Sequence, residues 1–327
     1  MTLPSPPQTS NPAPRRRWGR VVVLLLLAGI GALGWHLYTG QRAVRQLREA
    51  GFGRMSEDLG TRLGNAARTD WRLVFQRGTW QAPRSEWGIG FPEARKLRNF
   101  DAVAPALRRV KPEVLYLEHC FALQDASGLQ GLTSLRELHL AGCHELQNLD
   151  GLRDLGSLER LVIQDWPVLQ NVDGLKALPS LRSLDLLGCP ALQDFDGLKD
   201  LPRLERLTIR ECPSLRKMDA LKGLASLKVI SLSRCSGLRD LNGLKGLQGL
   251  ETLIISSCPS VRSVDALDGL TSLGILDLAG CTALEDVTAL KGLRKLIYVE
   301  LRGCTKLPPE QVEALKAAFP KDIIKYP

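Results

Sequence analysis

The sequence predicts an α/β solenoid, a coil with short parallel strands along one side, preceded by a single N-terminal transmembrane helix. Leucines recur every 23 residues from Leu135 to Leu296 without an insertion or deletion. Within each unit, apolar and polar residues alternate over about five residues, which is the period-two pattern of a half-buried strand. All eight cysteines occupy the same position of the unit. One unit buries too little apolar surface to fold alone, so neighbouring units must stack.

The first 38 residues predict a disordered tail followed by a membrane span. Residues 1–20 are rich in Pro, Ser and Thr and end in four arginines, which is typical of a disordered cytoplasmic tail. Residues 21–38 carry no formal charge and match the length of a transmembrane helix, with Trp35 and Tyr38 at its end. A retained signal anchor is favoured. The alternative is a cleaved signal peptide with residues 21–34 as its apolar region, which would make the protein secreted.

The charges around the span give the predicted orientation. Four arginines precede it, and Arg42, Arg45 and Arg48 follow it, so the positive-inside margin is one charge. A long folded domain crosses a membrane largely regardless of its charge, whereas an arginine-rich tail beside the span does not. We therefore expect a cytoplasmic amino terminus and repeats outside the cytoplasm, in the periplasm of a bacterial envelope or at the cell surface.

Residues 39–100 predict a basic stalk or a small irregular module. Residues 39–111 contain 15 basic and 7 acidic residues, a net charge of +8, whereas residues 112–327 carry a net charge of −3. The basic region is either a solvated spacer or a contact for an anionic membrane face or envelope polymer. Residues 101–111 contain a short amphipathic pattern that predicts an N-terminal capping helix.

Residues 112–307 form nine units of 23 residues, the last of which merges into the C-terminal region. With Pro112 as position 1, positions 4 and 6 are apolar and predict the buried face of a strand. Position 16 carries a short polar side chain, such as Asp150 or Asp173, and predicts a side-chain cap for a 3₁₀ turn. Residues 308–327 predict a C-terminal cap with a helix over Pro309–Phe319. In the last unit, Glu310 and Glu313 replace the apolar residues found at positions 15 and 18 of the other units, so no further unit is expected to stack.

Position 9 carries the cysteines and predicts a buried column of thiols. Eight cysteines in an exported chain ordinarily suggest disulfides. The identical phase favours free thiols covering turn carbonyls instead, although neighbouring rungs lie close enough for a bridge. The absence of a CxxC pair disfavours zinc. Trp166 replaces cysteine in the third unit, and packing in the core is favoured over an outward binding anchor. The column comprises Cys120, Cys143, Cys189, Cys212, Cys235, Cys258, Cys281 and Cys304.

The pattern LxxLxLxxC followed by LxxLxGLxxL resembles the leucine-rich repeat, with Cys where many members have Asn. The resemblance covers residues 112 to about 320, and the short unit is most similar to the bacterial internalin type and the phosphatase-regulatory-subunit type. It implies a horseshoe whose concave surface is formed by strand positions 3, 5 and 7. It also implies that this surface binds another protein.

The predicted binding residues stand at those three positions. A cationic patch and an apolar strip emerge, and both contain residue types that often dominate interfaces. The patch consists of Arg160, Arg206 and Arg210, and the strip of Val229, Ile254, Ile275 and Tyr298. Asp185, Glu300 and Arg302 complete the partner-binding candidates.

No motif predicts catalysis. His119, His139 and His144 stand at positions 8, 5 and 10, which are staggered along the strand direction. The sequence has no phosphate-binding loop and no nucleophile elbow. We therefore predict a non-enzyme without cofactor, metal or nucleic acid. Two alternatives stay open: an envelope scaffold that binds anionic polymer or carbohydrate through residues 39–111, and a cytoplasmic regulatory subunit of an enzyme.

Overall fold

The computed structural model describes residues 88–91, 98–101, 103–320 and 322–326. The predicted tail, the span at residues 21–38 and most of residues 39–100 lie outside these ranges. Among the residues that are described, no helix has both the length and the hydropathy needed to cross a bilayer.

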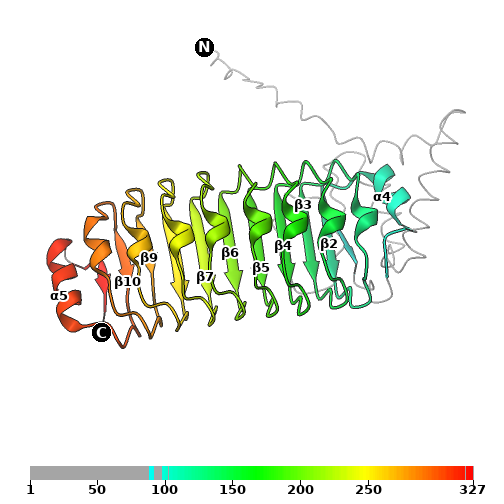
Figure 1. Ribbon diagram of the computed structural model, residues 1–327. Coiled ribbons are helices and arrows are strands. Elements are labelled where there is room, and N and C mark those ends of the chain that lie inside the picture. Colours follow the sequence, from blue (N-terminus) through cyan, green and yellow to red (C-terminus); the bar gives the residue numbers. More distant parts are fainter. Residues whose placement is uncertain (1–87, 92–97, 102, 321, 327) are drawn as a thin grey trace, which may run out of the picture.

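The described chain forms one eleven-stranded parallel sheet in which every strand lies next to the strand that follows it in sequence (Figure 1). The strands are β1 (Gly88–Phe91), β2 (Val114–Glu118), β3 (Glu137–Ala141), β4 (Arg160–Gln164), β5 (Ser183–Leu187), β6 (Arg206–Arg210), β7 (Val229–Ser233), β8 (Thr252–Ser256), β9 (Ile275–Asp277), β10 (Tyr298–Glu300) and β11 (Ile324–Lys325). The sequence did not predict the edge strands β1 and β11.

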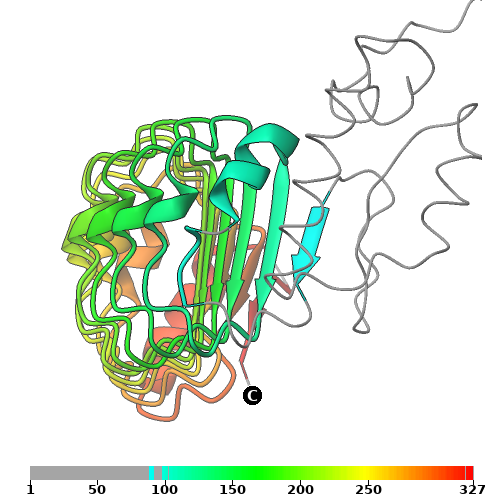
Figure 2. The same ribbon diagram turned by 90° about the vertical axis from the view of Figure 1, so that its right-hand side faces the viewer.

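Short 3₁₀ helices lie on the opposite side of the coil from the sheet, as the view along the stack shows (Figure 2). They are η2 (Ser127–Leu129), η3 (Asp150–Leu152), η4 (Asp173–Leu175), η5 (Asp196–Leu198), η6 (Asp219–Leu221), η7 (Asn242–Leu244), η8 (Asp265–Leu267) and η9 (Thr288–Gly292). Two α-helices, α4 (Ala104–Val110) and α5 (Pro309–Ala318), flank the repeats.

The sheet register follows directly from the 23-residue unit. Each residue of β2 pairs with the residue 23 positions later in β3, as Leu115 does with Leu138. Positions 4 and 6 point into the coil, and Leu184 and Leu186 of β5 are completely buried there. Positions 3, 5 and 7 point outward because successive side chains of a strand alternate between its two faces. The predicted solenoid and its inward leucines are therefore confirmed.

The residue after each strand, at position 8, has a left-handed backbone in all nine units. It takes a φ of 52° at Asp165 and 58° at Glu211, although neither residue is glycine. The amide of this residue donates to the position-7 carbonyl of the next unit, as Asp165 does to Leu187 at 2.9 Å. The bend turns the chain inward, which places position 9 in the core. The sequence did not predict this conformation.

The capping residue of the 3₁₀ turn differs from the prediction. In the described repeats, no position-16 side chain caps the turn. In seven of the eight turns, the side chain at position 14 instead accepts a hydrogen bond from the position-16 amide. The exception is η6, because its position 14 is Lys217, which has no acceptor. The Asp194 carboxylate accepts from the Asp196 amide at 2.7 Å, and the Asn171 amide oxygen accepts from the Asp173 amide at 3.2 Å. A short polar side chain two residues before an amide forms this kind of turn readily. Position 16 is already the first residue of the 3₁₀ helix.

Position 17 lies where consecutive turns approach each other closely. A Cβ atom on Gly197 would overlap the carbonyl oxygen of Val172 in the preceding unit. Because glycine lacks that atom, neighbouring 3₁₀ helices can stack directly.

Both predicted caps are present. Helix α4 buries Val103, Ala104 and Leu107 against the first unit, and α5 buries Val312 and Leu315 against the last. The predicted helix at residues 101–110 is shorter, because the α-helix begins at Ala104. The side chains at positions 15 and 18 of the last unit, both glutamates, are exposed, as expected where stacking ends.

The cysteines form the predicted buried column. All eight are free thiols, and none exposes more than 1% of its surface. The Cys281 thiol donates to the Ile255 carbonyl at 3.0 Å, and the Cys304 thiol donates to the Leu278 carbonyl at 3.2 Å. Burial raises the pKa of Cys281 to about 12 and that of Cys304 to about 11. These thiols therefore stay protonated at neutral pH.

Trp166 belongs to the same column. Its side chain is completely buried, and its indole nitrogen donates to the Leu146 carbonyl at 2.5 Å. The indole thus covers a main-chain carbonyl from the core, as the neighbouring thiols do. The interpretation of Trp166 as a core residue is confirmed.

Candidate binding face

The candidate binding face consists of the outward side chains of β2 to β10, at positions 3, 5 and 7 of each unit. We call it the sheet face. Because the register is constant, side chains at one position form a row across the strands, about 4.8 Å apart from strand to strand. All ten predicted partner-binding residues lie on this face. They differ in their availability to a partner, because some of them already form ion pairs with other side chains of the sheet face.

An ion-pair network covers β3 to β5. The Glu137 carboxylate contacts both the His139 ring nitrogen at 2.5 Å and the Arg160 guanidinium at 3.5 Å. Arg160 also reaches the Asp185 carboxylate at 3.5 Å, and His139 stacks on Tyr116 with ring centroids 4.3 Å apart. Arg160 therefore lies between two carboxylates. It belongs to this network rather than to the predicted cationic patch.

The other two arginines of the patch are different. Arg206 and Arg210 stand at positions 3 and 7 of β6, and both are exposed. Neither forms an ion pair with any residue in the described part of the chain. The Arg210 side chain donates only to the Ser233 hydroxyl, at 3.4 Å. Two guanidinium groups on one strand thus have no carboxylate partner among the residues that the structure describes.

The predicted apolar strip continues from β6 toward the carboxyl end. Val229, Ile275 and Tyr298 stand in the position-3 row of β7, β9 and β10, and Ile254 stands at position 5 of β8. Ile275 exposes 37% of its surface, and Ile297, just before β10, exposes 69%. Ile297 was not among the predicted residues because position 2 lies outside the strand.

A second network closes the sheet face at β10. The Arg302 guanidinium donates two hydrogen bonds to the Glu300 carboxylate, at 2.8 and 2.6 Å, and the Tyr298 hydroxyl donates a third at 2.9 Å. The Arg302 hydrogen bonds hold the pKa of Glu300 at about 2, well below its usual 4.5. Tyr298, Glu300 and Arg302 therefore form one preorganised group rather than three separate anchors.

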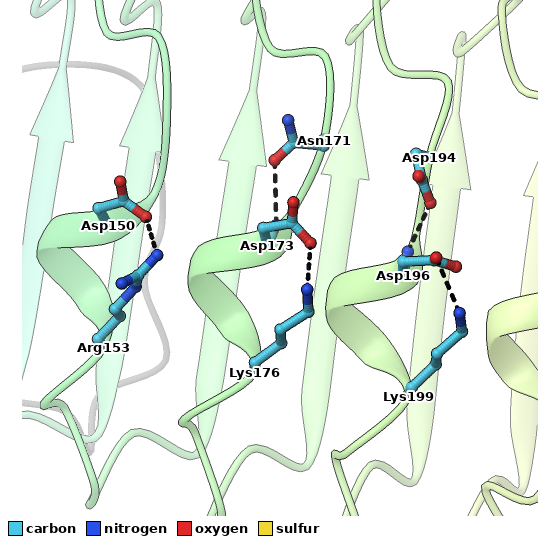
Figure 3. Close-up of polar contacts among 8 residues, drawn as sticks. All are labelled: Asp150, Arg153, Asn171, Asp173, Lys176, Asp194, Asp196 and Lys199. Atoms are coloured by element: carbon cyan, nitrogen blue, oxygen red, sulfur yellow. Dashed lines mark hydrogen bonds and ion pairs between the residues drawn. The ribbon is translucent and has the colours of Figure 1, made fainter.

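On the 3₁₀ side, several turns pair an aspartate with a basic side chain of the same turn. Asp150 pairs with Arg153, Asp173 with Lys176 and Asp196 with Lys199, at 2.6 to 2.8 Å within each turn (Figure 3). A groove on this side is lined by Arg153, Asp173, Lys176 and Ala177. Asp173 and Lys176 pair with each other and Arg153 pairs with Asp150, so the turns η3 to η6 present a regular ladder of solvated ion pairs.

The histidines do not converge. His119 and His144 lie on either side of Phe121, with ring centroids 5.5 and 4.9 Å from it, on the loops that follow β2 and β3. His139 lies apart from them, on the sheet face. In the described ranges, no group of three or more His, Cys, Asp or Glu side chains is arranged to hold a metal ion.

Comparison with known proteins establishes the fold. No protein-family model matches this sequence, and no curated protein sequence matches it. An internalin of Listeria monocytogenes, inlF, superposes with a TM-score of 0.53 at 21% identity over 67% of this chain. This chain covers 65% of that internalin, less than two thirds of its length. The leucine-rich repeat domain of the type III effector XopL superposes with a TM-score of 0.50 at 18% identity, over 96% of this chain and 97% of that one. The chain therefore has the leucine-rich repeat fold.

Proposed function

We propose that this chain is a membrane-anchored, non-catalytic protein-binding module that holds a protein partner on its sheet face. The observation that carries the proposal is the contrast between the two sides of the coil. Each of the turns η3 to η6 pairs an aspartate with a basic residue of the same turn. On the sheet face from β6 to β9, Arg206 and Arg210 form no ion pair with any described residue, and they lie beside the half-buried Val229 and Ile254 and the exposed Ile275. Exposed aliphatic groups beside unpaired cations are typical of a surface that another protein covers.

The uncharged segment at residues 21–38 supports the anchor, and the arginines before it support a cytoplasmic amino terminus. In this arrangement the repeats lie outside the cytoplasm. A compartment-sensitive reporter fused to the carboxyl end tests this part. We expect activity from a reporter that works only outside the cytoplasm. Activity from a reporter that works only in the cytoplasm would contradict the orientation.

Site-specific photo-crosslinking in membranes tests the binding face. The full-length chain carries the crosslinker at Thr208 or Thr252 on the sheet face, or at Lys222 or Lys245 on the 3₁₀ side as matched controls. We expect one discrete protein adduct from the sheet-face positions and none from the controls. Equal adducts from both sides, or adducts from the 3₁₀ side alone, contradict the proposal.

The basic region gives the competing arrangement, an envelope scaffold in which the repeats are a spacer. Its net charge of +8 over residues 39–111 suits an anionic polymer. Replacing Arg42, Arg45 and Arg48 with Gln in the full-length chain separates the two. The protein-binding proposal predicts an unchanged sheet-face adduct, whereas the scaffold predicts that retention in the envelope is lost while sheet-face positions give no adduct.

A further inference from the structure

The strongest asymmetry within the sheet face is the distribution of satisfied and unsatisfied charge. Arg160 lies between Glu137 and Asp185, and Arg302 is bound to Glu300 through two hydrogen bonds. Between these two networks, Arg206 and Arg210 form no ion pair with any residue of the described chain. The same residue type is thus neutralised at both ends of the face and left unpaired in its middle.

The residues directly opposite these arginines on the two neighbouring strands are uncharged. On the β7 side, the register places Val229 beside Arg206 and Ser233 beside Arg210. On the β5 side it places Ser183 and Leu187 beside them. The carboxylate of β5 on this face, Asp185 at position 5, is paired with Arg160. Both arginines therefore have uncharged direct neighbours, and among the described residues neither has an ion-pair partner.

Aliphatic side chains begin immediately beside this charge. Val229 follows Arg206 in the position-3 row, and Ile275 stands two strands further along the same row. Ile254 lies between them at position 5 of β8. Three strand steps, from β6 to β9, span about 14 Å, and Arg206 and Arg210 are about 13 Å apart along their strand. The region is about as large as one short peptide segment.

We propose that the region from β6 to β9 binds an acidic–aliphatic segment of a partner protein. Asp or Glu side chains of the segment pair with Arg206 and Arg210, and its Leu, Ile or Val side chains cover Val229, Ile254 and Ile275. This assignment rests on the proposed function and names the chemistry of the partner.

Charge complementarity decides between occupants. The planar guanidinium group of arginine can donate two parallel hydrogen bonds to a carboxylate. Aliphatic side chains that exclude water beside such a pair strengthen it. The amino-terminal part of this chain is a poor occupant, because residues 1–38 and 39–111 both carry net positive charge. An anionic polymer would satisfy the arginines but would leave the aliphatic side chains exposed.

The test uses the full-length chain in detergent and a displayed library of random 12-residue peptides. We expect the enriched peptides to contain Asp or Glu followed within about four to nine residues by aliphatic side chains, the number that covers 14 Å in an extended or helical segment. The best peptide is then synthesised, together with a version in which Lys replaces its acidic residues and a polyglutamate peptide without aliphatic residues.

Variants assign the contacts. We expect the double variant Arg206→Glu with Arg210→Glu to bind the acidic peptide about tenfold more weakly or worse. The same variant should bind the Lys version of the peptide better than the unmodified chain does. The double variant Ile254→Asn with Ile275→Asn should weaken binding of the selected peptide and of its Lys version. Two matched controls should leave binding unchanged: Arg239→Glu with Arg262→Glu, which reverses two exposed charges outside the sheet, and Val168→Asn, which changes an exposed aliphatic residue.

Each result has a definite meaning. Binding that survives the charge reversal at β6 but is lost with the isoleucine variants contradicts this inference and leaves the proposed function intact. Polyglutamate that binds as tightly as the selected peptide shows an anionic-polymer site and also contradicts it. A library that enriches no peptide on the unmodified chain, combined with no sheet-face photo-adduct, overturns both the inference and the proposed function.

Discussion

At the scale of single residues, the core of each turn is shaped around the side chain at position 9. Eight units place a thiol there, and the third places an indole that is completely buried. An indole is much larger than a thiol, so the residues around Trp166 have packed to fit it. The interior of a protein is close-packed, and a site adapted to a large side chain does not simply close when that side chain is removed.

Trp166→Cys should therefore destabilise the protein even though it restores the cysteine pattern. We expect a loss of about 3–5 kcal/mol in the free energy of unfolding, because the change leaves a cavity and removes the donor to the Leu146 carbonyl. Urea unfolding of the full-length chain in detergent measures it, with the exposed Val168→Ala as control. A variant as stable as the unmodified chain would show that the third unit has no adapted pocket.

Glu300 should make stability depend on pH in the acid range. Its folded pKa of about 2 lies below its usual 4.5, so its contribution is fully present above about pH 4.5 and is lost as the pH falls through about 2. Glu300→Gln should lower stability near neutral pH and lower it less at pH 2. Unfolding free energies of both chains across this range test the prediction, with the exposed Glu310→Gln as control. A difference that does not change with pH would contradict it.

At the scale of elements, the 3₁₀ turn η5 contains two polar residues with separate tasks. Asp194 at position 14 accepts the hydrogen bond that begins η5, and Asp196 at position 16 pairs with Lys199 at 2.8 Å. The first interaction satisfies a backbone amide that the helix leaves without a partner. The second joins two solvated side chains, and such pairs contribute little.

Asp194→Ala should therefore cost more stability than Asp196→Ala. We expect about 1 kcal/mol for the first change, the usual loss when a capping acceptor is removed, and a much smaller loss for the second. Chemical denaturation of the two variants provides a direct comparison, and Asn171→Ala repeats the position-14 test in the preceding turn. The opposite order would restore the original prediction that position 16 caps the turn.

The residues just before the strands, at position 2, carry a regular pattern of charge. Position 2 alternates in sign from Glu113 through Arg136, Glu159, Arg182, Glu205 and Lys228 to Glu251. Arg136 reaches Glu159 at 2.5 Å, and Arg182 reaches Glu205 at 2.6 Å. Opposite charges therefore meet between these consecutive units. Loss of one unit would bring like charges together along this edge.

The sequence predicted the strands and the thiol column because the same spacing recurs in nine units, and it predicted the two terminal helices from local patterns at residues 101–111 and 309–319. It did not predict the left-handed bend at position 8, because only four units have glycine there and the others carry unrelated residues such as Glu211 and Arg234. The edge strands β1 and β11 lie outside the repeat and have no periodic signal. The pairing of Arg160 with Glu137 and Asp185 depends on side-chain conformations, which residue spacing does not determine.

At the scale of the whole molecule, the solenoid is a row of units that each contact only their neighbours. Stability in such a row is close to a sum of unit and interface contributions, and its ends must be covered. Helix α5 covers the last unit with Val312 and Leu315, both completely buried. The C-terminal units therefore depend on a helix that the other units lack.

Leu315→Ala should loosen the C-terminal units first. We expect a loss of about 2–5 kcal/mol at this end, with faster amide exchange in β9 and β10 than in β3 and β4. Hydrogen exchange followed by mass spectrometry resolves the two ends, and Ala314→Ser on the exposed side of α5 serves as the control. Equal loss of protection along the whole coil would mean that the row unfolds as one unit.

The central claim is that stacked turns enclose every thiol and leave the opposite surface of the strands for a partner. Counting reactive thiols by mass spectrometry tests it most directly, since all eight cysteines lie in the repeats and are free and buried. A thiol-alkylating reagent at pH 8 should add no label to the folded protein and eight labels after denaturation without reductant. Labels on the folded chain, or fewer than eight after denaturation, would place thiols on the surface or in disulfides and contradict the account.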